Sequence, residues 1–69
     1  MTQSEMILTH LQRHGSITPQ EAMREYGCMR LGARIYDLRQ QGHEIQRDMV
    51  QAENRFGVKT SFARYFLKQ

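Results

Sequence analysis

A chain of 69 residues has room for one domain with one modest hydrophobic core, since a chain this short buries only about 60% of its unfolded surface. The composition, 39% hydrophobic and 25% charged, predicts a single folded domain over residues 1–69, and the one Cys excludes an internal disulfide or structural zinc site. No apolar run approaches the roughly 20 residues that span a bilayer and no targeting segment is evident, so we expect a cytoplasmic protein without a membrane partner.

Charge is distributed unevenly along the chain. Residues 1–25 carry two basic and three acidic residues, whereas residues 26–69 carry eight basic and four acidic residues. The net charge of +3 therefore belongs to the C-terminal two thirds. Such an excess of Lys and Arg favours an anionic partner such as nucleic acid, although many solvated surfaces show a similar bias.

The first predicted helix runs from about Gln3 to His14. Thr2, with Glu5 three residues later, has the form of a capping box, and Gly15 is a suitable end. Between them, apolar residues recur at helical spacing: Ile7, Leu8 and Leu11. These features together predict an amphipathic helix.

A second, short helix is predicted from the segment Thr18 to Glu21. It has a threonine at the N-cap, a proline at the first helical position and a glutamate that can close a capping box. The predicted inward face consists of Ala22, Met23 and Tyr26. Gly27 stops the helix after about two turns, and residues 16–17 before it can add a short strand to a sheet formed later in the chain.

The third predicted helix follows a turn at Gly27 and Cys28 and runs from about Met29 to Gln41, ending at Gly42. Its predicted buried stripe is Leu31, Ile35 and Leu38. At 100° per residue, the opposite face carries Met29, Arg30, Ala33, Tyr36, Asp37 and Gln40, with Arg34 and Arg39 flanking the stripe. This face is available to a partner.

After Gly42 the period changes to the alternation of a strand. Residues 45–50 alternate, a polar loop is predicted from Gln51 to Gly57, and a second strand from Val58 to Leu67 is rich in aromatic and β-branched residues. The segment 45–67 therefore predicts a β-hairpin with a long, basic tip.

Several segments taken together resemble a known family. They are Ile17 to Ala22, the turn Tyr26 to Cys28, the run Arg30 to Arg39, and Gly42 with His43. The chain is similar to the small helix-turn-helix domain proteins of bacteriophages and prophages, and more distantly to winged-helix DNA-binding domains of arginine-repressor type. The resemblance spans about residues 7–67, apart from the loop 51–57.

The resemblance implies an α+β fold: a winged helix-turn-helix with three helices and a C-terminal antiparallel sheet of two or three strands. It also implies that the third helix reads DNA. Ala33 and Arg34 stand where arginine-repressor-like domains have Ser-Arg, so this chain lacks the serine hydroxyl as a donor. No cofactor, metal or small-molecule ligand is expected.

The predicted partner is double-stranded DNA, contacted by a transcriptional regulator of phage or prophage type. A recognition helix places its N-terminal half in the major groove, and a basic hairpin can follow phosphates or enter the minor groove. The candidate DNA-binding residues are Arg30, Ala33, Arg34, Tyr36 and Arg39 on the helix and Arg47, Arg55 and Lys59 on the hairpin.

The same residues also have simpler structural explanations. Arg30 and Arg34 can pair with Glu25 or Asp37 and merely solvate the helix, and basic hairpin residues also discourage edge-to-edge aggregation. In addition, Asp37 places a negative charge near the reading face, which Met29, Ala33 and Tyr36 make apolar. The alternative function is therefore a protein interaction module, such as a phage accessory or inhibitor protein, or a homodimer that uses the same face.

No enzyme is predicted, because the sequence contains no paired carboxylates, phosphate-binding glycine loop or nucleophile motif. His10 and His14 are spaced by one helical turn but lack further ligands at metal-binding spacing, so we interpret them as part of an ordinary helix surface. Cys28 is interpreted as a small buried turn residue and His43 as a loop residue.

Overall fold

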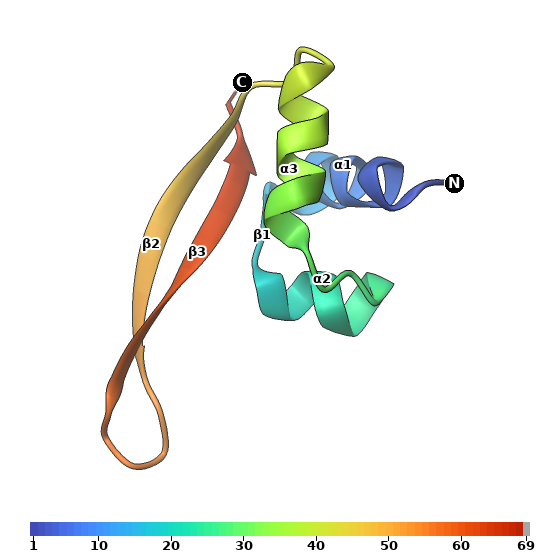
Figure 1. Ribbon diagram of the computed structural model, residues 1–69. Helices are drawn as coiled ribbons and strands as arrows, with labels where there is room; N and C mark the ends of the chain where they lie inside the picture. The colour runs from blue at the N-terminus through green and yellow to red at the C-terminus, as the bar shows by residue number, and fades with distance from the viewer. Residues whose placement is uncertain (69) are drawn as a thin grey trace.

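The computed structural model describes residues 1–68 (Figure 1). The elements in chain order are α1 (Gln3–His14), β1 (Ser16–Ile17), α2 (Pro19–Tyr26), α3 (Leu31–Gln40), β2 (Ile45–Glu53) and β3 (Lys59–Leu67). Three helices and a three-stranded antiparallel sheet confirm the expected α+β architecture. Among the described residues, no helix has the length and apolar character needed to cross a bilayer.

Capping boxes start both α1 and α2, as the sequence predicted. The Thr2 hydroxyl accepts the Glu5 N–H at 3.2 Å, and the Glu5 carboxylate accepts the Thr2 N–H at 3.2 Å. Thr18 and Glu21 repeat this exchange at 3.2 and 3.0 Å. Each box satisfies backbone donors that the first helical turn leaves without partners, which fixes where the helix begins. Both helices end at glycines with positive φ, Gly15 and Gly27.

The third helix is shorter than the range 29–41 expected from the sequence. Arg30 has φ −123° and ψ 63°, which is not helical, and it provides no side-chain cap. Met29 and Arg30 therefore belong to the turn between α2 and α3, so the prediction of a helix starting at Met29 was wrong. The predicted buried stripe of α3 is confirmed: Leu31, Ile35 and Leu38.

The sheet has the order β1-β3-β2, and the predicted short strand at residues 16–17 is confirmed. Ser16 pairs with Phe66, and the β2–β3 ladder extends from Ile45 opposite Leu67 to Glu53 opposite Lys59. The predicted loop at residues 51–57 was too long at its start, because residues 51–53 continue the ladder. Backbone hydrogen bonds, together with a bond from the Thr60 hydroxyl to the Ala52 carbonyl at 3.3 Å, sustain that pairing, which hydrophobic alternation does not reveal.

The core lies between the three helices and the base of the sheet. Its buried apolar side chains are Ile7, Leu11, Ile17, Ala22, Cys28, Leu31, Ile35, Leu38 and Ile45. Cys28 is buried in its turn as expected. Met23 was predicted to face inward but is 47% exposed, because α2 covers the core with Ala22 and Tyr26, four residues apart on one face.

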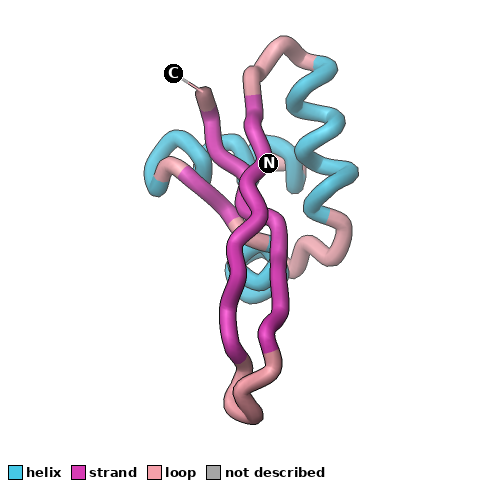
Figure 2. Tube along the Cα trace, turned by 90° about the vertical axis from the view of Figure 1, so that its left-hand side faces the viewer, coloured by secondary structure: helices cyan, strands magenta, loops and turns pink. Residues whose placement is uncertain are grey.

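The hairpin of β2 and β3 extends well beyond this core as a twisted arm (Figure 2). Every residue from 51 to 60 is exposed, and the longest dimension of the molecule is 40 Å against 24 and 20 Å for the others. The arm extends past α2, so that its tip projects beyond the end of the molecule where α3 begins (Figure 1). The fold thus presents a helix face and a projecting arm.

Candidate nucleic-acid interface

The outer face of α3 is open to solvent. Tyr36 is 61% exposed, and Met29, in the turn before the helix, is 80% exposed, whereas Ala33 is half-buried between them in sequence. One side of α3 lies close to the sheet. A Cβ at Gly32 would come within 3.9 Å of the Tyr65 hydroxyl of β3.

Two candidate DNA-binding arginines on α3 already contact the protein itself. Arg34 forms an ion pair with Asp37, with 3.3 Å between Nη2 and Oδ2, one of the pairings that the plainer reading of the sequence allowed. Arg39 donates from Nε and Nη2 to the Ile45 carbonyl at 3.1 and 2.8 Å, which joins the end of α3 to the start of β2. Each therefore has fewer donors available to a ligand than its sequence position indicated.

The other four candidate cations differ from these two arginines. Within residues 1–68, no ion pair involves Arg30, Arg47, Arg55 or Lys59, and all four are exposed. Arg64, by contrast, pairs with Asp48 across the ladder at 3.7 Å. The unpaired cations lie at the start of α3, the helix to which the resemblance assigns DNA reading, and along the arm, whose basic residues made it the second candidate region.

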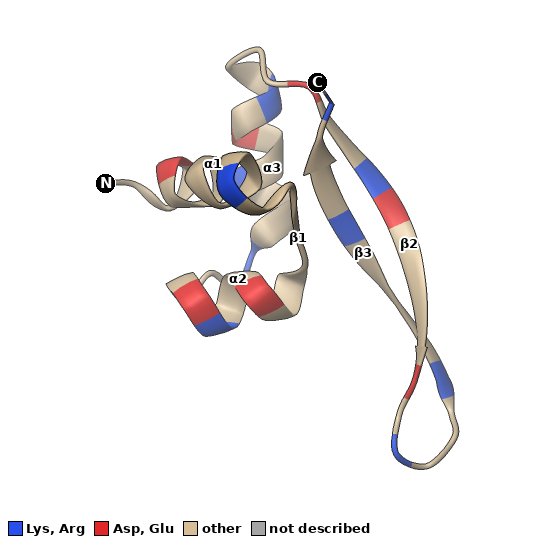
Figure 3. Ribbon diagram, turned by 180° about the vertical axis from the view of Figure 1, so that it is seen from behind, with Lys and Arg blue, Asp and Glu red and all other residues tan. Residues whose placement is uncertain are grey.

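Acidic side chains are concentrated away from the arm's tip. Viewed from behind, α2 carries two acidic bands, while the distal hairpin carries more basic than acidic positions (Figure 3). Among residues 54–68, every charged side chain is basic: Arg55, Lys59, Arg64 and Lys68. A polyanion that approached along the arm would meet an attractive potential.

A shallow hollow lies at the start of α3. It is lined by Gln3, Gly27, Met29, Arg30 and Arg34, and the Nε of Arg34 is buried there without a hydrogen-bond partner among the described residues. A hollow bordered by two guanidinium groups suits an anionic oxygen. The sequence did not indicate Gln3 as part of this region, because the start of α1 reaches α3 only through tertiary packing.

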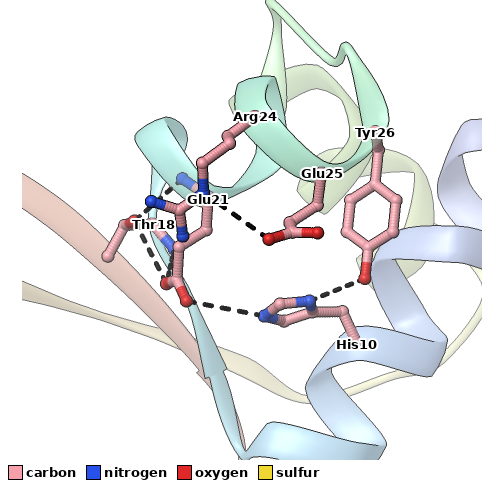
Figure 4. A network of polar contacts seen from close by, with 6 residues as sticks. All are labelled: His10, Thr18, Glu21, Arg24, Glu25 and Tyr26. Atoms are coloured by element: carbon pink, nitrogen blue, oxygen red, sulfur yellow. Dashed lines mark hydrogen bonds and ion pairs between the residues drawn. The ribbon is translucent and has the colours of Figure 1, made fainter.

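A polar network around the buried His10 links α1 and α2 (Figure 4). Nδ1 of His10 lies 2.7 Å from the Tyr26 hydroxyl, and Nε2 lies 3.8 Å from the Glu21 carboxylate. His10 is only 6% exposed, so its assignment to the helix surface was wrong. The missed signal is its position three residues after Ile7 and one before Leu11, which places it on the apolar stripe of α1.

Burial sets the protonation state of this histidine. Desolvation lowers the pKa of His10 below its ordinary value of 6.5, and the neighbouring His14 adds to that effect, while Glu21 and Glu25 oppose it. The ring is therefore neutral near pH 7, and the carboxylate of Glu21 favours the tautomer with its proton on Nε2. In that tautomer, the 2.7 Å contact is a hydrogen bond that the Tyr26 hydroxyl donates to Nδ1. Among residues 1–68, no three His, Cys, Asp or Glu side chains are grouped as a metal site would require.

A helix-turn-helix formed by α2 and α3, followed by an antiparallel hairpin, defines a winged helix-turn-helix domain. A sequence model described as a winged helix-turn-helix domain matches residues 2–69, and the chain belongs to this family. Comparisons with curated proteins and with solved structures gave no significant match. Domains of this family are typically non-enzymatic and bind DNA, so membership suggests DNA as the partner.

Proposed function

We propose that this domain binds duplex DNA with α3 in the major groove and the arm on the adjacent backbone or minor groove. The observation that carries the proposal is the location of the unpaired cations, Arg30 at the start of α3 and Arg47, Arg55 and Lys59 along the arm. Phosphate contacts position a protein on DNA, and side chains on the inserted helix read the bases.

The exposed face of α3 has the dimensions and chemistry for the major groove, which is about 12 Å wide and admits one helix. Arg30 can reach guanine from the start of the helix, while Ala33 and Tyr36 offer apolar contact to thymine methyl groups. Arg34 lies beside the hollow at the same end of α3, where a backbone phosphate could replace Asp37 as its partner. Arg39 contributes more weakly, since two of its donors bind Ile45.

The finer role that fits this surface is transcriptional regulation in a phage or prophage, within the cytoplasm. The support for it is the resemblance of the run Arg30 to Arg39 to the small phage proteins. A lone domain of this size reads few base pairs, so we propose that it acts as a homodimer or beside a second protein on DNA.

Fluorescence anisotropy on a random labelled duplex at several salt concentrations tests the proposal. If Arg30, Arg47, Arg55 and Lys59 each neutralise one phosphate, the slope of log affinity against log salt is about −3.6, and affinity falls about 150-fold between 50 and 200 mM. The Arg55→Ala/Lys59→Ala variant halves that slope. Arg24→Ala is the matched control, because Arg24 is an exposed arginine that pairs with Glu25 on α2.

Two results would count against DNA binding through these residues. If the protein bound no duplex even at low salt, the proposal of DNA binding would be refuted. A slope unchanged in the Arg55→Ala/Lys59→Ala variant would show that the arm does not contact phosphates.

The exposure of Tyr36 and Met29 favours a second candidate, a protein interaction module that uses the face of α3. Such an interface would be tight and insensitive to salt, because apolar and aromatic anchors dominate it. Tyr36→Ala would abolish it, whereas Arg55→Ala would change it little. The salt titration with these two variants separates the candidates.

A further inference from the structure

The tip of the arm is held in one shape by a single asparagine. The Asn54 side-chain oxygen accepts the N–H of Phe56 at 2.9 Å and that of Val58 at 3.1 Å. The Asn54 backbone also exchanges hydrogen bonds with its loop neighbours, donating to the Val58 carbonyl and accepting from Gly57, both at 3.0 Å. Gly57 has φ 76°, which a side chain would disfavour. The loop is therefore organised by its own polar contacts, without help from a core.

This ordered loop presents a phenylalanine to solvent. Phe56 is 84% exposed at the far end of the arm, and none of its neighbours from 51 to 60 is buried. The shape of the loop does not depend on the Phe56 side chain, because Asn54 bonds to the backbone N–H groups of Phe56 and Val58. A single exposed apolar side chain is common on protein surfaces and does not by itself indicate a partner, but at the end of the arm Phe56 is free to contact one.

Charge around the tip indicates what kind of partner that is. Arg55 directly precedes Phe56, and Lys59 follows three residues later, both without ion pairs in the described chain. An aromatic side chain with a cation on either side in sequence suits a base step flanked by phosphates, and the tip stays net basic although Glu53 lies opposite Lys59 in the ladder. It does not match a flat apolar interface, which is depleted in lysine.

We propose that Phe56 is a wedge that enters between two neighbouring base pairs from the minor groove, unstacks them and bends the duplex, with Arg55 and Lys59 on the flanking phosphates. This inference rests on the proposed function, because it takes α3 as the element in the major groove. Apolar side chains of this kind are used to unstack base steps from the minor groove. The arm projects past the end of the molecule where α3 begins (Figures 1 and 2). With α3 in the major groove, the tip would therefore reach the duplex beyond the base pairs that α3 contacts.

If Phe56 acts as a wedge, the protein should prefer duplexes that are easily unstacked, and this preference can be measured without knowing its specific DNA site. Unstacking costs least at a mismatch and at flexible pyrimidine–purine steps such as TA. The full chain should bind a duplex with one central mismatch roughly tenfold more tightly than the matched duplex. In a TA-rich duplex that carries 2-aminopurine, binding should raise the fluorescence of that base as it loses its stacking partner.

Three variants isolate the ring. Phe56→Ala should lose the mismatch preference and the fluorescence rise, while the salt slope of binding stays as in the wild type because no charge is removed. Phe56→Leu should keep part of both signals, since leucine also serves as a wedge. Val58→Ala is the matched control: it removes an exposed apolar side chain from the same tip and should leave both signals unchanged. Thermal unfolding of each variant checks that the fold is retained.

The outcomes separate this inference from the proposed function. If the wild type binds duplexes with a steep salt slope but shows no mismatch preference and no unstacking, the wedge is refuted and DNA binding stands. The same holds if Phe56→Ala retains both signals. If the wild type binds no duplex at low salt, both proposals fall together.

Discussion

Replacing Tyr26 with phenylalanine tests whether the buried contact between α1 and α2 holds in solution. The substitution keeps the ring in place and removes only the hydroxyl that lies 2.7 Å from Nδ1 of His10. His10 is buried and its Nε2 already lacks a hydrogen-bond partner, so the variant leaves both ring nitrogens unsatisfied. Since such a loss costs about 1–3 kcal/mol and this bond is only partly buried, we expect a cost of about 1–2 kcal/mol.

Urea unfolding followed by circular dichroism measures this cost. With a slope of about 1 kcal/mol per M for so small a domain, the midpoint should fall by about 1–2 M. The His10→Leu/Tyr26→Phe double variant serves as the control. It removes both polar partners at once, so it should be more stable than Tyr26→Phe alone. A Tyr26→Phe midpoint within about 0.3 M of the wild type would refute the hydrogen bond.

The pH dependence of stability follows from the same residue. Because burial lowers the pKa of His10 in the folded state, the folded chain binds fewer protons than the unfolded chain. The stabilisation is complete above the ordinary value of 6.5 and is lost as the pH falls from there toward the folded pKa. Unfolding at pH 8, 7, 6 and 5 should show a decline that His10→Leu reduces and His14→Gln mostly retains, since burial is the larger cause.

Three further substitutions test the framework that positions the interface. Gly32→Ala in α3 should raise the free energy of unfolding by about 0.5–1 kcal/mol, because the new Cβ meets only the Tyr65 hydroxyl at 3.9 Å, and a lower thermal midpoint would contradict this. Arg39→Ala should cost about 1–2 kcal/mol, as the Ile45 carbonyl loses both donors, with Arg39→Lys restoring only part of it in urea unfolding. Thr18→Ala should cost about 1 kcal/mol through loss of the α2 cap, whereas Thr18→Ser should cost little.

The sequence predicted the first two helices well because their signals are local. Threonine, proline and glutamate at fixed spacing define the start of α2 whatever surrounds it, and Gly27 ends it. The start of α3 was misplaced because nothing local caps it. Arg30 takes a non-helical conformation that the apolar spacing of Leu31, Ile35 and Leu38 does not encode.

The candidate site was predicted less completely than the fold, since side-chain partners depend on packing. The positions of Arg47, Arg55 and Lys59 on the hairpin could be anticipated from the sequence, whereas Arg30 was expected within the helix and lies in the turn before it. The contact of all four with DNA stays a prediction. The engagement of Arg39 with Ile45 could not be anticipated, because it arises where β2 turns back past the end of α3. Similarly, the conformation of the loop that begins at Asn54 depends on side-chain hydrogen bonds, which cannot be predicted from the spacing of apolar residues.

Pairing of β1 with β3 constrains how the domain is made during translation. Ser16 pairs with Phe66, and Ile17 pairs with Tyr65. The strand β1 can therefore pair only after residues 65 and 66 have been synthesised. Until those residues are available, β1 has no partner strand and Ile17 is not covered by the sheet. Pairing between residues so far apart in the sequence also slows folding. The domain is therefore expected to mature only after residue 67 has left the exit tunnel, and premature termination within β3 would leave the helices without their sheet.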